Sequence, residues 1–208
     1  MEKFTRITTQ RCIMSTNPTP RILQLDMAGS PHSWLTIEEA IGYYARDMVL
    51  YELGSPVATY RGGINRITNQ ESTLTANSII SIKSTHVKDA GFHKTPALTN
   101  ETLFERDRYV CAYCGDKYHT TDLSREHIIP VCQRGVNSWM NVVTACKPCN
   151  NKKGGRTLDQ SNMSLLYLPY VPNRYEAFII SQGTRRILAD QMEFLLRKVP
   201  NTSRLKTN

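Results

Sequence analysis

The sequence of 208 residues contains no long hydrophobic run. A helix needs about 20 consecutive apolar residues to cross the hydrocarbon core of a bilayer, and no segment approaches that length. The segment 1–21, MEKFTRITTQRCIMSTNPTPR, also lacks the apolar stretch of a secretory signal. We therefore expect an intracellular, cytoplasmic protein with no membrane partner.

Acidic residues are scarcer than basic ones, and the imbalance is uneven along the chain. The formal net charge is +8; residues 1–100 hold 10 Lys and Arg against 8 Asp and Glu, and residues 101–208 hold 16 against 10. A basic excess concentrated in one half favours a polyanionic partner, most often nucleic acid. The alternative is a basic surface that only improves solubility.

Cysteine is also scarce, but its spacing is specific. Four of the six cysteines form two C-x-x-C pairs, Cys111 with Cys114 and Cys146 with Cys149, and Cys12 and Cys132 stand apart. Two such pairs in an intracellular chain are typical of a four-thiolate zinc site. A thiol-redox protein is the alternative, and tightly bound zinc would count against it.

The pattern of apolar and turn residues predicts an α+β fold with five segments. Residues 1–20 form a flexible arm, 21–84 a small α+β domain, 85–99 a linker, 100–160 the cysteine-bearing domain, and 161–208 a helical extension with a basic, frayed tail. In the small domain we expect strands at Arg21–Met27, Met48–Leu53, Val57–Tyr60 and Ser78–Lys83, a turn at SPHSW, and a helix capped by Thr36. Gly54, Ser55 and Pro56 are expected to join the second and third strands.

The segment that contains the two cysteine pairs has a distinct order of predicted elements. A helix capped by Asn100 comes first, and a strand then ends near Pro130. A loop, a return strand NVVTAC and a helix from Pro148 to Gly154 follow. The order strand, loop, strand, helix leaves His127 near the end of the first strand, where it is either a base aimed at a phosphodiester or merely an exposed turn residue.

These motifs resemble the HNH endonuclease family, with its ββα-metal fold, and most closely the zinc-knuckle nucleases of bacteria and phages. The likeness covers roughly Glu101–Leu158. It rests on the two C-x-x-C pairs, on EHIIP, and on ACKPCN followed by Lys153 and Gly154. The sequence departs from the family pattern in having Glu126 where Asp is usual, Cys132 where Ser is common, and RGV in place of Gly-Gly.

The resemblance implies roles for individual residues. His127 matches the general base, and Asn141 matches the asparagine that braces the loop orienting the histidine. Asn150 takes the final position, where the family has His or Asn. Glu126 and Asn150 would hold a catalytic divalent ion, Mg²⁺ or Mn²⁺, and the cysteines would hold a structural Zn²⁺.

The chemistry of the residues agrees with that assignment. Phosphodiester hydrolysis needs a base for a water molecule and positive charge near the phosphate, and a neutral imidazole can act as a base near pH 7. We expect DNA to be the partner, with backbone contacts from Lys147, Lys152, Lys153 and Arg156. The alternative is a zinc-stabilised DNA-binding module with a degenerate, inactive site.

Overall fold

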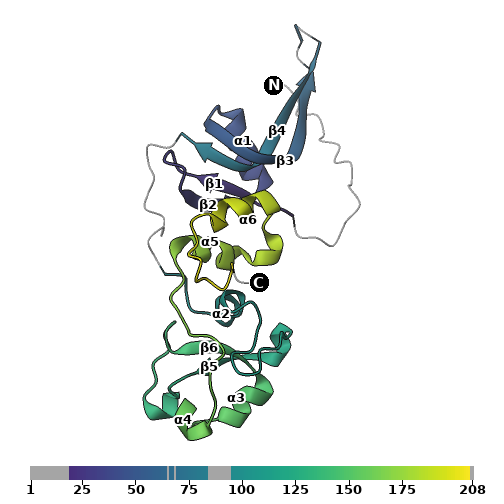
Figure 1. Ribbon diagram of the computed structural model, residues 1–208. Helices are drawn as coiled ribbons and strands as arrows, with labels where there is room; N and C mark the ends of the chain where they lie inside the picture. Colours follow the sequence, from purple (N-terminus) through teal and green to yellow (C-terminus); the bar gives the residue numbers. More distant parts are fainter. Residues whose placement is uncertain (1–18, 65, 68, 84–94, 207–208) are drawn as a thin grey trace.

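The computed structural model describes residues 19–64, 66–67, 69–83 and 95–206. Nearly all of the predicted arm and most of the predicted linker lie outside these residues. The described chain forms two regions stacked end to end, with α2 between them (Figure 1). We call them the sheet region, residues 19–83 together with 174–206, and the cysteine region, residues 95–173.

The sheet region contains a four-stranded sheet in the order β2-β1-β4-β3. Its strands are β1 (Ile22–Leu25), β2 (Pro31–Leu35), β3 (Val49–Ile64) and β4 (Glu71–Ile82). β1 runs parallel to β4, and the other two pairs are antiparallel. The predicted turn at SPHSW is wrong, because residues 31–35 form β2 and pair with β1.

Both faces of this sheet are covered by helices, which explains why all four residues of β1 are buried. Alternate residues point to opposite faces, so Ile22 packs with Ala40 of α1 (Ile37–Ala45) and Leu23 packs with Ile179 and Leu195 of two C-terminal helices. Those helices are α5 (Arg174–Gln182) and α6 (Ala189–Leu196). As predicted, Thr36 caps α1 in a capping box with Glu39.

The C-terminal segment therefore belongs to the same core as the N-terminal strands. Predicting 161–208 as a separate extension misses this packing. The predicted frayed tail is also wrong, because Val199 and Ser203 are buried and the Ser203 hydroxyl donates a hydrogen bond to Glu176. The cysteine region is thus inserted between two parts of the chain that fold together.

β3 differs most from its prediction. One strand runs through Gly54, Ser55 and Pro56, which were expected to separate two strands. The register shifts on both sides of Pro56, and β3 lies at the edge of the sheet, where proline and bulges are tolerated. Together with β4 it extends beyond the sheet as a two-stranded arm (Figure 1).

The cysteine region begins with α2 (Asn100–Arg106), which is capped by Thr99 rather than by the predicted Asn100. The 3₁₀ turn η1 (Thr120–Asp122), β5 (Leu123–His127) and the 3₁₀ turn η2 (Val131–Gln133) follow. Next come β6 (Val142–Cys146), α3 (Lys147–Lys153) and α4 (Leu158–Ser161). β5 and β6 are antiparallel, with Leu123 opposite Cys146 and His127 opposite Val142.

The fold is therefore a mixture of α and β, as the sequence predicts. Among the described residues, none of the helices has the length and apolar character needed to cross a bilayer.

Candidate metal centre and candidate active site

The four predicted cysteine ligands converge at one end of the β5–β6 pair. Their Sγ atoms all lie within 4.8 Å of one another. Tetrahedral zinc with Zn–S bonds of about 2.3 Å places its sulfur atoms about 3.8 Å apart. The cluster therefore has the size and the donor chemistry of a closed four-thiolate metal site.

Local backbone structure holds the first cysteine pair against the second. The Cys111 N–H donates to Asp116 O (2.9 Å) and the Ala112 N–H to Thr144 O in β6 (2.8 Å). Gly115 follows the pair at a φ of 80°, a conformation that favours glycine. Cys146 ends β6 and Cys149 lies in α3, so the cluster links a turn, a strand and a helix.

Burial favours the protonated thiols of this cluster unless a cation is bound. Cys111 and Cys146 are buried, and burial together with the neighbouring thiols raises the pKa of Cys149 well above its usual range. Four thiolates packed together repel one another unless positive charge is supplied. A bound metal ion supplies that charge and keeps the thiols deprotonated.

His127 lies at the other end of β5. It is half-buried, and its Nε2 atom is buried without a hydrogen-bond partner in the described part of the chain. A buried polar atom without a partner costs free energy, so such atoms are few in folded proteins and tend to occur at functional sites. The position of His127 follows from the register, since it pairs with Val142 at the last step of the strand pair.

Asn141 braces the loop that follows His127. Its Oδ1 accepts a hydrogen bond from the Ile129 N–H (2.9 Å), and its Nδ2 donates to Ile129 O (3.0 Å) and Val136 O (2.9 Å). Its own backbone oxygen accepts from the Ile128 N–H (2.9 Å). The side-chain amide thus pairs with backbone groups as a neighbouring strand would, and it fixes the backbone immediately after the histidine.

Gly135 closes the same loop because no side chain fits there. A Cβ atom at this position would lie 1.7 Å from Ile129 O and 2.9 Å from Pro130 O. Its N–H donates to Pro130 O (2.9 Å). The loop from Ile129 to Gly135 is therefore closed by a direct contact of backbone with backbone.

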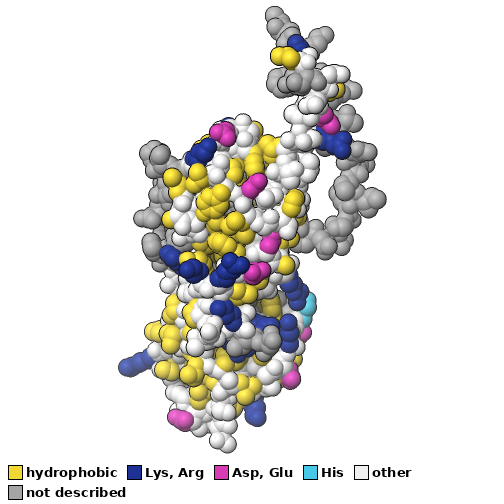
Figure 2. All heavy atoms as spheres, turned by 45° about the horizontal axis from the view of Figure 1, so that its top comes forward, with side chains coloured by type: hydrophobic (Ala, Val, Ile, Leu, Met, Phe, Trp, Pro, Cys, Tyr) yellow, Lys and Arg dark blue, Asp and Glu magenta, His cyan; other side chains and the backbone are white. Residues whose placement is uncertain are grey.

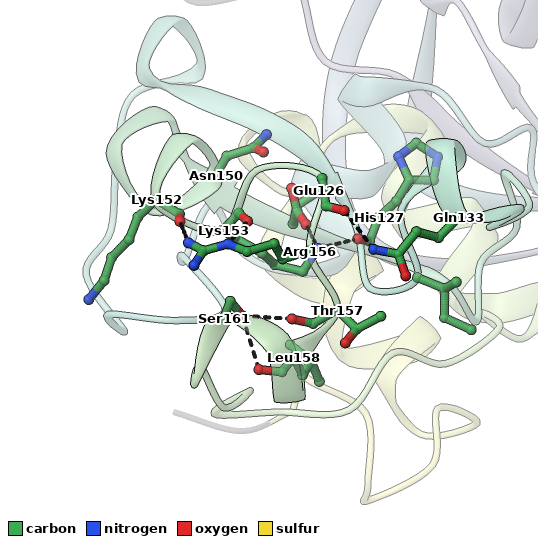
Figure 3. A network of polar contacts seen from close by, with 12 residues as sticks. Glu126, His127, Gln133, Asn150, Lys152, Lys153, Arg156, Thr157, Leu158 and Ser161 are labelled. Atoms are coloured by element: carbon green, nitrogen blue, oxygen red, sulfur yellow. Dashed lines mark hydrogen bonds and ion pairs between the residues drawn. The ribbon is translucent and has the colours of Figure 1, made fainter.

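Glu126 is buried beside His127, and its partner is unexpected. Only 4% of the residue is exposed, and Oε1 forms an ion pair with the ammonium of Lys153, which is fully buried. Burial raises the pKa of the Glu126 carboxyl, whereas Lys153 and His127 lower it. Figure 3 shows the Glu126 and Lys153 side chains beside each other.

Asn150 and Lys153 are one helical turn apart and reach β5 from the same side of α3. The Asn150 Nδ2 atom donates to the Ser124 hydroxyl (2.7 Å), and the Lys153 Nζ atom donates to His127 O (2.7 Å). Ser124 and Glu126 are two residues apart, so both side chains lie on one face of β5. The side chains of Glu126 and Asn150 thus approach the same face of β5, and each carries an oxygen of the kind that a hard divalent ion prefers. Lys153 already pairs with one oxygen of the Glu126 carboxylate.

The four predicted DNA contacts do not share one environment. Lys147 and Lys152 are exposed, and Figure 3 shows Lys152 pointing away from the Glu126 cluster. Arg156 is exposed, but its Nε atom donates to Lys153 O (3.2 Å). The predicted contact between Lys153 and DNA disagrees with the structure, because this side chain has no exposed surface. Asn150 and Lys153 are three residues apart in a predicted helix, and this spacing in the sequence indicates that both side chains lie on the same face of the helix.

A second basic site, which the sequence pattern does not indicate, lies where the two regions meet. Arg108, Lys117 and Arg185 line a cavity of about 230 Å³ there, and Arg185 stacks over the Tyr109 ring at 5.8 Å. Figure 2 shows Lys and Arg side chains gathered around this waist of the molecule. These residues are far apart in the sequence, so no local pattern reveals that they meet.

Comparison with known proteins agrees with the site. Residues 111–166 match the family model described as HNH endonuclease. The matched segment includes all four clustered cysteines together with Glu126, His127, Asn141, Asn150 and Lys153. The chain has no match among curated proteins. The cysteine region of this protein therefore contains a domain of the HNH endonuclease family.

Proposed function

We propose that the protein is a metal-dependent endonuclease that hydrolyses phosphodiester bonds in DNA. In this proposal β5, β6 and α3 form the ββα-metal unit, His127 is the general base and Asn141 positions its loop. Glu126 and Asn150 hold one divalent ion, Mg²⁺ or Mn²⁺. The four cysteines hold a structural zinc ion.

The observation that carries the proposal is the half-buried imidazole of His127, which has no hydrogen bond within the described residues. The backbone after it is held by Asn141. A general base needs an unoccupied lone pair at a fixed position within hydrogen-bond reach of its substrate. A histidine that merely served the fold would be expected to donate to or accept from a neighbour.

The reaction follows from this geometry. The imidazole of His127 accepts a proton from a water molecule as the water oxygen forms a bond to phosphorus. The bond between phosphorus and the 3′ oxygen breaks, which leaves a 5′-phosphate and, after protonation, a 3′-hydroxyl. The imidazolium then returns its proton to solvent, which restores the base.

The two metals have separate roles in this proposal. Glu126 and Asn150 would hold a divalent ion, and its chemistry there would be to supply positive charge near the phosphate and the leaving oxygen. The four thiolates leave no open coordination position, so zinc there stabilises the fold. The zinc end of the strand pair and the His127 end are opposite ends of β5, which keeps the two sites apart.

DNA would lie against the exposed part of α3. Lys147, Lys152 and Arg156 are exposed around this helix and can contact backbone phosphates. Lys153 is not included, because it is buried between Glu126 and His127. The family match supports DNA as the substrate, since endonucleases of this kind act on nucleic acid.

The test compares His127→Ala with His119→Ala. His119 is an exposed histidine of the same region, with its ring near Thr121. Zinc-loaded proteins are mixed with supercoiled plasmid and with single-stranded DNA in Mg²⁺ or Mn²⁺. We expect His127→Ala to cut roughly 10²- to 10⁴-fold more slowly with unchanged zinc content, and His119→Ala to cut like the wild type.

Two outcomes contradict the proposal in different ways. If wild-type protein bound DNA but cut neither substrate in either metal, it would be a zinc-stabilised DNA-binding module with an inactive site. If His127→Ala cut as fast as wild type, the nuclease assignment would stand and the assigned base would be wrong.

A further inference from the structure

Lys153 is the most unusual charged residue of the candidate active site. Its side chain has no exposed surface, although lysine is almost never fully buried unless it is paired. Its ammonium group has two partners, the Oε1 atom of Glu126 and the backbone oxygen of His127 at 2.7 Å. One side chain thus contacts both the proposed metal ligand and the proposed base.

A purely structural explanation accounts poorly for this arrangement. Buried ion pairs contribute little net stability, because removing two charges from water costs about as much free energy as their attraction returns. An apolar pair of similar volume would hold α3 against β5 as well. A buried polar contact of this kind does fix geometry, since its hydrogen bonds are satisfied in only one arrangement.

The contacts show which geometry is fixed. Asn150 Nδ2 donates to the Ser124 hydroxyl, and Lys153 lies one turn later against Glu126. The helix α3 therefore contacts two side chains that lie on the same face of β5. The bond from Lys153 to His127 O holds the strand end from which the imidazole projects. Asn141 holds the next residues from the other side. Lys153 therefore holds the backbone of His127 itself, and Asn141 holds the loop residues that follow it.

We propose that Lys153 is a positioning residue, which orients the Glu126 carboxylate and fixes the backbone of His127 in the competent site. This inference rests on the proposed function. Lys153 remains on Oε1 when a divalent ion binds, because moving away would leave a buried ammonium without its anionic partner. The ion is therefore left with the other oxygen of Glu126. Lys153 orients this ligand, and its positive charge opposes the ion.

This role differs from that of a ligand in a measurable way. Loss of a ligand weakens metal binding, and more metal restores activity. Loss of Lys153 removes a positive charge that repels the divalent ion, so metal binding should be no weaker. It also frees the backbone of His127 to move, so cleavage should fall. A displacement of about 1 Å at a reacting group can lower the rate by about 10²-fold.

The experiment compares Lys153→Met with Lys198→Met, which replaces an exposed lysine of the sheet region. Three quantities are measured for each zinc-loaded protein: Mn²⁺ affinity by titration, the ring proton signals of His127 by NMR, and plasmid cleavage at saturating Mn²⁺. For Lys153→Met we expect Mn²⁺ affinity equal to or tighter than wild type, shifted His127 signals, and cleavage at least about tenfold slower that added Mn²⁺ does not restore. Lys198→Met should match the wild type in all three.

A second variant covers the case in which Lys153→Met does not fold. Glu126→Gln/Lys153→Met removes both buried charges, so no unpaired ion remains, and retained zinc reports that the region is folded. Its His127 signals should shift compared with Glu126→Gln alone. The inference is overturned if Lys153 replacement leaves the His127 signals unchanged, or if it weakens Mn²⁺ binding and excess Mn²⁺ restores cleavage.

Failure of the proposed function would look different. If wild-type protein cut no DNA, the nuclease assignment would fall, but the Mn²⁺ titration and the His127 signals would still show whether Lys153 positions these groups.

Discussion

The sheet region and the cysteine region are held together by different kinds of interaction. In the sheet region, buried aliphatic residues of β1 and β4 pack against helices on both faces of a four-stranded sheet. In the cysteine region, two short strands and short helices surround a thiol cluster and buried ionic groups such as Arg106 and Lys153. One region is held by apolar area on both faces of a sheet. The other combines a smaller apolar cluster that includes Leu103, Phe104 and Val142 with buried ionic groups and four cysteines positioned to bind a metal ion.

The two regions also differ in how the chain builds them. The cysteine region is continuous, whereas the sheet region needs segments from both ends of the described chain. They meet at α2, where Glu105 is buried and accepts hydrogen bonds from the Tyr109 hydroxyl (2.7 Å) and from Thr184 Oγ1 (3.1 Å). The buried apolar clusters of the two regions share no residue, so we expect each region to lose its structure separately.

The largest effect should come from removing a metal ligand. Cys149→Ser should unfold the cysteine region alone, because structural zinc sites contribute on the order of 10 kcal/mol to folding. Hydrogen exchange measured by mass spectrometry should show that residues 100–160 lose their protection, whereas β1, β4 and α6 keep theirs.

Cys132→Ser is the matched control for this experiment. Cys132 is exposed and lies outside the thiol cluster, so its replacement should leave zinc content and protection unchanged. Loss of protection in both regions of Cys149→Ser would show that they fold as one unit, and the comparison would be wrong.

The second largest effect should come from a truncation in the core of the sheet region, which tests the other region of the molecule. Leu195 of α6 has no exposed surface and packs with Leu23 and Ile79 of the sheet. Leu195→Ala should lower the free energy of unfolding of the sheet region by about 2–5 kcal/mol. Zinc content should not change. Leu168, which is largely exposed, provides the control, because Leu168→Ala should change neither quantity measurably.

The sequence predicted the cysteine region better than the sheet region for a physical reason. A four-thiolate site restricts both residue type and spacing. The sequence alone therefore predicts which cysteines lie together, namely Cys111, Cys114, Cys146 and Cys149. The packing of Leu195 on Leu23 depends only on apolar area. Many apolar residues satisfy that requirement, so no local pattern shows that the two ends of the chain share a core.

The same reasoning explains the misplaced elements. Pro56 normally interrupts a strand, but an edge strand with a bulge accommodates it, and edge position is a tertiary property. Lys153 was predicted at the surface because lysine usually is. Its burial follows from the partner that β5 presents, Glu126, which could be inferred only once α3 was aligned on that strand.

The third effect concerns the loop of the candidate active site. Gly135→Ala places a Cβ atom against Ile129 O, so the backbone after His127 must move. We expect a loss of about 1–3 kcal/mol in stability of the cysteine region, as for other overpacked positions, and a clear loss of cleavage with zinc retained. The control is Gly63→Ala in the sheet region, since a Cβ atom there meets nothing within 4 Å. Normal cleavage by Gly135→Ala would show that the loop tolerates displacement.

The smallest expected effect decides which region binds the DNA backbone. Lys147 and Lys152 lie on α3 in the cysteine region, whereas Lys117 and Arg185 line the cavity at the junction. Removing one basic side chain that binds a phosphate of duplex DNA lowers the slope of log affinity against log salt by about 0.9. Fluorescence anisotropy of labelled duplex, measured without added divalent ion, gives this slope without interference from cleavage.

We expect Lys147→Ala/Lys152→Ala to lower the slope by about 1–2 and the junction pair Lys117→Ala/Arg185→Ala to lower it less. The reason is position, since α3 carries the proposed metal ligand Asn150, and phosphates next to the scissile one would lie within reach of the long lysine side chains on the same helix. Both double variants remove two positive charges, so a difference between them reports location and not net charge. A larger decrease for the junction pair would place the bound DNA across both regions, and the sheet region would then take part in substrate binding.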